Sequence, residues 1–110
     1  MGGTMITIRK YEFDVAGLIE EYMPESGVSE LIEVRMPEGA KVLAFGSQKP
    51  RTVCAWAIVN TENSPELRTF RLHSTGYPLP ENCSASNHVA TVMDGAFVWH
   101  VFETEEPQHA

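Results

Sequence analysis

Basic residues are scarce in this sequence. Lysine and arginine together number 8, against 15 aspartates and glutamates, and the formal net charge at pH 7 is −7. Binding to the backbone of nucleic acids is driven by Lys and Arg side chains that displace counterions. We therefore expect no nucleic acid as the principal partner, and we expect an acidic surface that keeps the protein soluble.

Cysteines and long apolar runs are also few. The two cysteines are Cys54, in an apolar run, and Cys83, in a polar stretch, and neither belongs to a CxxC motif. This usage predicts free thiols in a reducing compartment and no structural zinc site. No apolar run reaches the roughly 18 to 20 residues of a membrane helix, and the first residues lack the order of a secretory signal. We expect a cytoplasmic protein with no membrane segment.

Catalytic motifs are missing as well. The sequence contains no GxSxG, GxxxxGK[ST], HExxH or GxGxxG, the patterns that place a nucleophile, a phosphate cradle, a metal site or a dinucleotide-binding turn. The acidic pairs Glu20-Glu21 and Glu105-Glu106 are typical of solvated surface, because acid–base chemistry needs carboxylates in a shared cleft. The sequence predicts a protein that is not an enzyme and indicates no cofactor.

Short strand-like runs account for most of the 110 residues. Hydrophobic residues make up 43% and charged residues 21%, which is ordinary usage for one globular domain, 1–110. The predicted strands are residues 4–13, 29–36, 40–46, 52–59, 68–73, 88–93 and 96–103. Proline, glycine and polar residues separate them, the only helix candidate is 15–23, and the tail 104–110 should fray. These patterns predict a mainly β fold of about seven short antiparallel strands, built as a sandwich or a small barrel.

The run 52–59, TVCAWAIV, is apolar on both faces. We expect this strand to be central in its sheet or covered by a second sheet or subunit. Further burial of such strands between subunits favours a homo-oligomer.

The last two strands flank Asp94-Gly95, which predicts a two-residue type I′ hairpin with positive φ at both positions. Counting outward from this turn, His100 lies opposite Val89, and His88 is offset from it by one position. The side chains of His88 and His100 are therefore expected on opposite faces of the sheet, which argues against a shared metal site.

One stretch suits a small anion such as phosphate or carboxylate. A strand carrying two arginines leads into a loop rich in hydroxyl groups and glycine, and arginine forks and loop N–H groups both bind anions. The plainer alternative is that Arg71 covers a sheet face and that residues 74–76 form an ordinary turn. The candidate ligand-binding residues are Arg68, Arg71, His73, Ser74, Thr75, Gly76, Tyr77 and His100.

A set of short motifs occurs in a fixed order and covers most of the chain. These motifs are Lys10-Tyr11, Met36-Pro37-x-Gly39-Ala40, Trp56-Ala57-x-Val59, Arg68-x-Phe70, Thr75-Gly76-x-Pro78 and Val98-Trp99-His100-Val101-Phe102-Glu103. Together they resemble a family of small uncharacterised proteins found in bacteriophages and prophages. The chain departs from the family pattern at Ser74, where a glycine is expected, at Tyr77, where a histidine is expected, and in the longer stretch 15–30. The resemblance implies a phage origin, a location in the host cytoplasm and no established activity.

Three functions are consistent with these observations. The first is a non-catalytic phage-type accessory protein that binds a host or phage protein, with an anti-defence role by analogy with other small phage proteins. The alternative is a homo-oligomer that sequesters a small anion or a nucleotide signal at the candidate residues above. The second alternative is a component of the virion or of its assembly.

Overall fold

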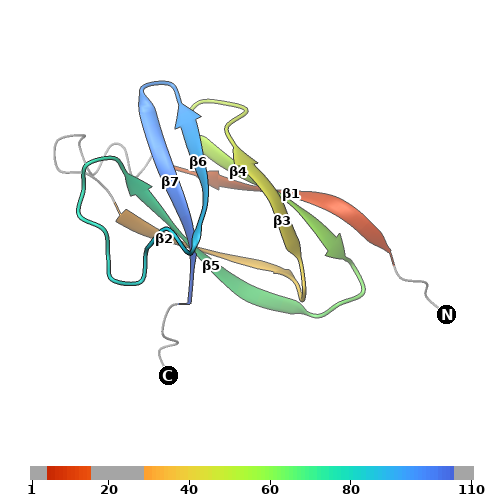
Figure 1. Cartoon of the computed structure of the whole chain (residues 1–110). Helices are drawn as coiled ribbons and strands as arrows, with labels where there is room; N and C mark the ends of the chain where they lie inside the picture. The colour runs from red at the N-terminus through yellow and green to blue at the C-terminus, as the bar shows by residue number, and fades with distance from the viewer. Residues whose placement is uncertain (1–4, 16–28, 106–110) are drawn as a thin grey trace.

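The computed structural model describes residues 5–15 and 29–105, and these form seven strands in two sheets (Figure 1). The strands are β1 (Ile6–Asp14), β2 (Ser29–Pro37), β3 (Lys41–Gly46), β4 (Thr52–Asn60), β5 (Pro65–Ser74), β6 (His88–Asp94) and β7 (Phe97–Thr104). One sheet has the order β1-β4-β3 and the other the order β2-β5-β7-β6, with every neighbouring pair antiparallel. The predicted β fold of seven antiparallel strands is confirmed, as a sandwich of two sheets rather than one closed barrel.

The helix expected at residues 15–23 lies outside the described residues from residue 16 onward. Val15 is described, and its N–H donates to the carbonyl of Arg51 over 2.9 Å. This bond continues the β1–β4 ladder beyond the end of the strand, and the Val15 side chain is fully buried. Within the ranges that the structure describes, no helix is long and apolar enough to cross a membrane.

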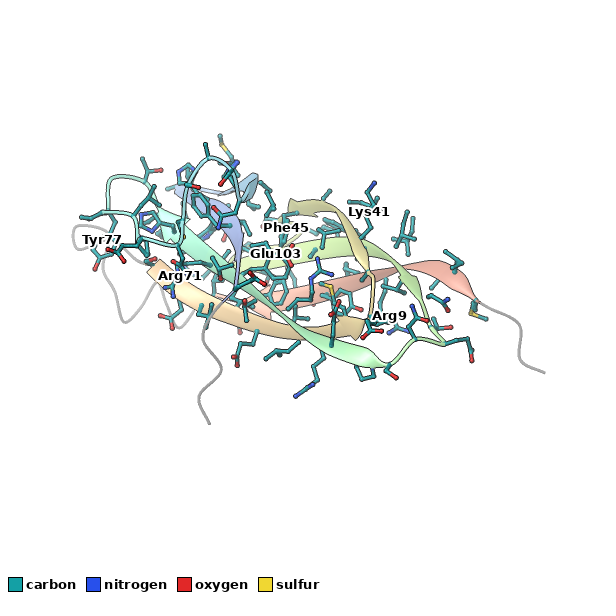
Figure 2. All side chains as sticks on the ribbon, turned by 60° about the horizontal axis from the view of Figure 1, so that its bottom comes forward. Arg9, Lys41, Phe45, Arg71, Tyr77 and Glu103 are labelled. Atoms are coloured by element: carbon teal, nitrogen blue, oxygen red, sulfur yellow. The ribbon has the colours of Figure 1, made fainter. Side chains whose placement is uncertain are left out.

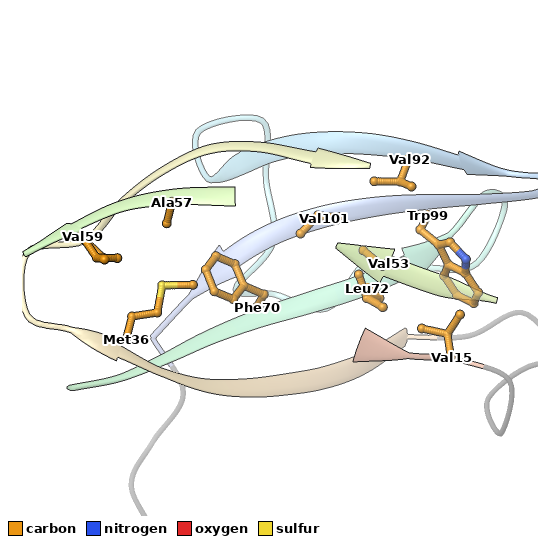
Figure 3. Close-up of a cluster of buried hydrophobic side chains, with 11 residues drawn as sticks. Val15, Met36, Val53, Ala57, Val59, Phe70, Leu72, Val92, Trp99 and Val101 are labelled. Carbon is orange, nitrogen blue, oxygen red and sulfur yellow. The ribbon is translucent and has the colours of Figure 1, made fainter. Parts of the chain in front are cut away.

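The inward faces of the two sheets enclose one hydrophobic core (Figure 3). Strand β4 lies between β1 and β3, as its apolar sequence predicts, and contributes alternate residues that are almost wholly buried. Strands β5, β6 and β7 face it from the other sheet. The core side chains are Val15, Met36, Ala40, Val53, Ala57, Val59, Phe70, Leu72, Val92, Trp99 and Val101.

The β6–β7 turn differs from the predicted one. Asp94 pairs with Phe97 and belongs to the ladder, so the two-residue loop is Gly95-Ala96. Gly95 has φ 59°, and the only non-glycine residue with positive φ in the described ranges is Arg51. A single positive φ at the first loop position is the type II′ pattern, which places glycine there. The type I′ prediction for Asp94-Gly95 is therefore wrong by one residue.

A β-bulge between His88 and Ala90 also changes the predicted register. His88 pairs with Phe102, and Thr91 pairs with His100. Phe102, the partner of His88, lies two residues from His100 on β7, and residues two apart on a strand share a face. The extra residue of the bulge therefore places the side chains of His88 and His100 on the same face of the sheet. The prediction that the two histidines point to opposite faces is wrong.

Several strand ends differ from the boundaries predicted from the sequence, among them the start of β5 and the end of β7. Strand β5 begins at Pro65 rather than at residue 68, since Pro65 pairs with Pro37 at the end of β2. Strand β7 runs to Thr104, which is buried and pairs with Thr69. The Thr69 hydroxyl donates to the Thr104 carbonyl, so Thr104 belongs to the strand rather than to the expected tail, of which residues 106–110 lie outside the described residues.

Candidate functional site

The outer face of the four-stranded sheet carries most of the predicted ligand-binding residues. Leu72 and Val101 point into the core, so their neighbours His73 and His100 point outward. These two histidines are direct cross-strand partners on β5 and β7. The segment between β5 and β6 contacts this face, since Nε2 of His73 lies 2.6 Å from the carbonyl oxygen of Tyr77.

A pocket of about 350 Å³ opens where the β5–β6 segment leaves the sheet. Six of the eight predicted residues line it, together with two apolar side chains. The lining residues are His73, Ser74, Thr75, Gly76, Tyr77, Leu79, His100 and Phe102. The loop and the two strands therefore meet at one site, as the anion hypothesis requires, but without either arginine.

Arg68 lies on the inner side of β5, away from the pocket. Its guanidinium bonds both carboxylate oxygens of Glu103, over 2.6 and 3.1 Å, and donates to the carbonyl of Ala40 over 2.8 Å. The hydrogen bond to Glu103 raises the pKa of Arg68, against the opposing effect of burial. These contacts engage all three guanidinium nitrogens within the protein, so the structure assigns Arg68 to the join between the sheets.

Arg71 points outward toward β2 instead. Its Nη1 donates to the carbonyl of Ser29 over 3.2 Å. Figure 2 shows Arg71 and Tyr77 at the same end of the molecule, with Glu103 nearer the middle. Arg71 is absent from the pocket lining, so the plainer alternative, an arginine covering a sheet face, describes its position.

A chain of hydrogen bonds runs across the outer face next to the pocket. The hydroxyl of Thr75 lies 2.8 Å from Nε2 of His100. On the other side of the ring, Nδ1 of His100 lies 3.1 Å from the hydroxyl of Thr91, which lies 3.0 Å from Nε2 of His88. The chain depends on the bulge that turns His88 to this face, and no signal in the sequence marks the position of that bulge.

His73 fixes the start of the pocket loop. Its Nε2 lies 2.6 Å from the carbonyl of Tyr77, and since a carbonyl can only accept, Nε2 carries the proton. The ring is 3% exposed, and Nδ1 is buried without a hydrogen-bond partner among the described residues. The hydrogen bond with His73 thus fixes the Tyr77 backbone, while Tyr77 as a residue is 43% exposed.

Burial lowers the pKa of His100 below its usual 6.5, and the charges of nearby His88 and His73 lower it further. The pocket therefore holds a neutral imidazole at neutral pH. None of its described lining residues is Lys, Arg, Asp or Glu. In the part of the chain that the structure describes, no group of three His, Cys, Asp or Glu residues is placed to hold a metal ion. What remains is a neutral surface that offers hydroxyl, imidazole and aromatic groups to a ligand.

We expect stability to fall as the pH drops below about 6.5, the ordinary pKa of histidine. The lowered pKa of folded His100 means that the unfolded chain binds this proton more readily, so protonation favours unfolding. The loss begins below that pH and is complete once the pH has passed below the lowered value. The measurement is the thermal midpoint across this range, compared with His100→Asn, whose midpoint should decline less. Parallel declines in the two proteins would contradict the assignment to His100.

A second surface, the outer face of the β1-β4-β3 sheet, is not among the sites predicted from the sequence. The run 4–13 alternates through Ile6 and Ile8 and then through Tyr11 and Phe13, with charged residues between them, and this pattern predicts a strand with one wet face. The two pairs differ in parity, so they lie on opposite faces. Ile6 and Ile8 are 61% and 59% exposed, while Tyr11 and Phe13 pack against the core. This change of parity within the run is the signal that could have revealed the surface.

The exposed isoleucines extend across the sheet. Ile8 pairs directly with Ile58 on β4, which is 37% exposed. Cross-strand partners on one face touch one another, so these side chains form a continuous apolar area. We call the side chains of Ile6, Ile8 and Ile58 the isoleucine face.

Comparison with known proteins shows the family of this chain. A family described as a domain of unknown function (DUF7352) matches residues 5–110, and the chain belongs to it. No curated protein and no solved structure matches the chain.

Proposed function

We propose that this member of the DUF7352 family acts without catalysis, by binding another protein along strand β1. The observation that supports this is the open edge of β1. Among the described residues the strand has β4 on one side only, and its first five residues are all exposed. Such an edge can accept a strand from another chain, because its unpaired N–H and C=O groups form a ready template.

The hydrogen bonds at the two ends of β1 identify which backbone groups face outward. The Thr61 N–H donates to the Met5 carbonyl, and the Val15 N–H donates to the Arg51 carbonyl. Bonded pairs in an antiparallel ladder recur at every second residue, so the odd-numbered residues of β1 bond to β4. The even-numbered residues Ile6, Ile8, Lys10 and Glu12 direct their N–H and C=O groups to the open edge.

The other sheet edges are less suited to strand addition. Strand β3 has a bulge between Val42 and Ala44, and β6 has one between His88 and Ala90. Bulges interrupt the regular ladder and are a common protection of edges. Strand β2 is half-buried along most of its length. By contrast, β1 pairs with β4 over nine consecutive positions without a break.

The isoleucine face indicates what kind of segment would dock. Ile6 and Ile8 lie on the edge strand and point to the same face. Lys10 and Glu12 occupy the next two positions of that face and form an ion pair over 3.0 Å. A strand added at this edge would place alternate side chains next to these residues. The segment we expect is extended, with apolar side chains opposite the isoleucines and polar ones opposite Lys10 and Glu12.

Replacing Ile8 with proline is expected to weaken docking while the fold is retained. Proline lacks an N–H, and it is tolerated on edge strands where that N–H would face solvent. The matched control is Ile8→Ala, which removes the side chain and keeps the N–H. Loss of a ladder bond should make the proline variant bind about tenfold more weakly than the alanine variant.

The binding partner would be captured from host cells with the tagged protein, purified, and measured for affinity against both variants. Hydrogen exchange then locates the interface, with slower exchange expected at the amides of Ile6, Ile8 and Lys10. A partner that leaves these amides unprotected, or that binds both variants equally, would rule out β1 as the docking strand. Light scattering tests whether the partner is a second copy, since a dimer through β1 would become monomeric in Ile8→Pro.

We further propose that this binding serves a bacteriophage or prophage in the host cytoplasm, with a host or phage protein as partner and an anti-defence role. The support for this origin is the ordered set of motifs that resembles a phage family. The test is expression of the protein in a host that carries phage defences. Protection of an infecting phage by the wild type, and not by Ile8→Pro, is the expected result.

A further inference from the structure

We infer that the pocket between β5, β7 and the loop at residues 74–79 binds an uncharged planar ring that forms hydrogen bonds, with a nucleobase as the ligand class. The site is on the sheet opposite to β1, so this inference does not depend on the proposed protein binding. It rests on three features of the pocket: an exposed tyrosine whose backbone carbonyl is hydrogen-bonded, an adaptable hydrogen-bonding floor, and the absence of charged residues from its described lining.

The exposed tyrosine is Tyr77. The residue is 43% exposed, although its carbonyl is held by the buried ring of His73 over 2.6 Å. The His73 and Tyr77 rings lie 5.7 Å apart at 44°. The backbone under this ring is therefore fixed, which reduces the entropy lost on binding. Leu79 and Phe102 complete the apolar part of the lining, and aromatic and apolar side chains of this kind stack on bases.

The floor consists of His100 and Thr75, joined by a hydrogen bond of 2.8 Å. Because His100 is also bonded to the hydroxyl of Thr91 over 3.1 Å, and hydroxyls both donate and accept, the whole chain can reverse its direction. Thr75 can then offer either a donor or an acceptor to a ligand. The edge of a nucleobase carries both kinds of group, and such a floor can pair with either.

Among the described lining residues, no ionic group would select a phosphate or an amine. Arg68 is bonded to Glu103 and Ala40, Arg71 reaches toward Ser29, and His100 is held neutral by its lowered pKa. An anion in this pocket would lose its hydration without gaining a countercharge. The sequence predicts an anion site at these residues. The uncharged lining favours an uncharged ring as the ligand instead.

A nucleobase could come from a free nucleoside or from a single strand of nucleic acid. The net charge of −7 opposes the approach of a polyanion, so we expect the nucleoside. The experiment adds adenosine, guanosine, cytidine and uridine separately to isotope-labelled protein and follows the amide spectra. Short single-stranded oligonucleotides of the same bases form the second arm.

At least one nucleoside should bind saturably and shift the amide signals of Thr75, Gly76 and Tyr77. Tyr77→Ala should weaken that nucleoside by at least about fivefold, the effect of losing one stacked ring. Thr75→Val keeps the shape of the side chain and should also weaken binding by removing the hydroxyl. The control is Met93→Ala, which changes a side chain that is 73% exposed on the same sheet but outside the pocket, and it should bind like the wild type.

The inference is overturned if none of the four nucleosides shifts the pocket amides, or if Tyr77→Ala binds like the wild type. Tighter binding of an oligonucleotide that survives Tyr77→Ala would also overturn it. The thermal midpoint of each variant is measured to check folding. Because Tyr77 is exposed, Tyr77→Ala should leave the midpoint unchanged, so this variant tests the inference even if Thr75→Val is destabilised. Ile8→Pro should bind the nucleoside normally, which separates failure here from failure of the proposed protein binding.

Discussion

Phe70→Ala is expected to lower the free energy of unfolding by about 3 to 5 kcal/mol, the usual range for removing a buried phenylalanine. The Phe70 ring is 1% exposed and lies between the sheets, where it meets the ring of Phe45 edge to face with centroids 5.4 Å apart. The guanidinium carbon of Arg68 lies 5.9 Å from its centroid. A small domain has only about 5 to 15 kcal/mol of stability, so this variant should be close to unfolding at physiological temperature.

Urea unfolding of the wild type and of Phe70→Ala measures this loss, and Tyr77→Ala is the control. Tyr77 is also a large aromatic residue, but 43% of it is exposed, so its replacement should change stability by about 0.5 kcal/mol or less. Equal effects of the two replacements would contradict the packing of the sheets described above. A double variant with Phe45→Ala should show a coupling of about 0.5 to 1.5 kcal/mol between the two rings.

The class of fold could be predicted because each strand has a local signature. The apolar run that became β4 predicts a central strand, since both of its faces are covered to a large extent. Pro37-Glu38-Gly39 predicts the turn before β3, and Gly39 indeed has φ 81°. These features depend on neighbouring residues alone, and neighbouring residues are what a single sequence displays.

Register and facing were harder to predict because they depend on partners far along the chain. One bulged residue near His88 reverses the facing of that histidine relative to His100, and a bulge has no composition of its own. Strand β1 shows the same difficulty. Its isoleucines look like core residues, but only the position of β4 decides which parity faces inward.

The candidate pocket was partly predictable for the same reason. Residues 73–77 are consecutive, so any fold keeps them together, and His100 joins them through the β5–β7 pairing. Arg68 and Arg71 belong to the same strand as His73, but they serve other contacts. Arg68 differs in parity from His73 and so faces inward, whereas Arg71 shares its parity and reaches sideways to β2.

Breaking the pair between Arg68 and Glu103 is expected to have the second largest effect on stability. The side chain of Arg68 is 17% exposed and that of Glu103 is 35% exposed. Arg68 also donates to the carbonyl of Ala40, which directly precedes β3, so this one side chain joins the two sheets. Glu103→Gln leaves the enclosed guanidinium without its countercharge, at a loss of about 1 to 3 kcal/mol. This is less than the 3 to 5 kcal/mol of a fully buried pair, because water screens the more exposed carboxylate.

Arg68→Met separates the charge from the packing, because methionine keeps most of the apolar stem of Arg68 and leaves no cation. It should destabilise the protein less than Glu103→Gln, since the carboxylate that it leaves unpaired is the more exposed partner and can be hydrated. The double variant should then match Arg68→Met, since Glu103 has no cation left to neutralise. Urea unfolding of the three variants completes a double-mutant cycle. If the two single losses simply add in the double variant, the pair is not coupled, and the join between the sheets must rest on the Arg68–Ala40 bond and on core packing.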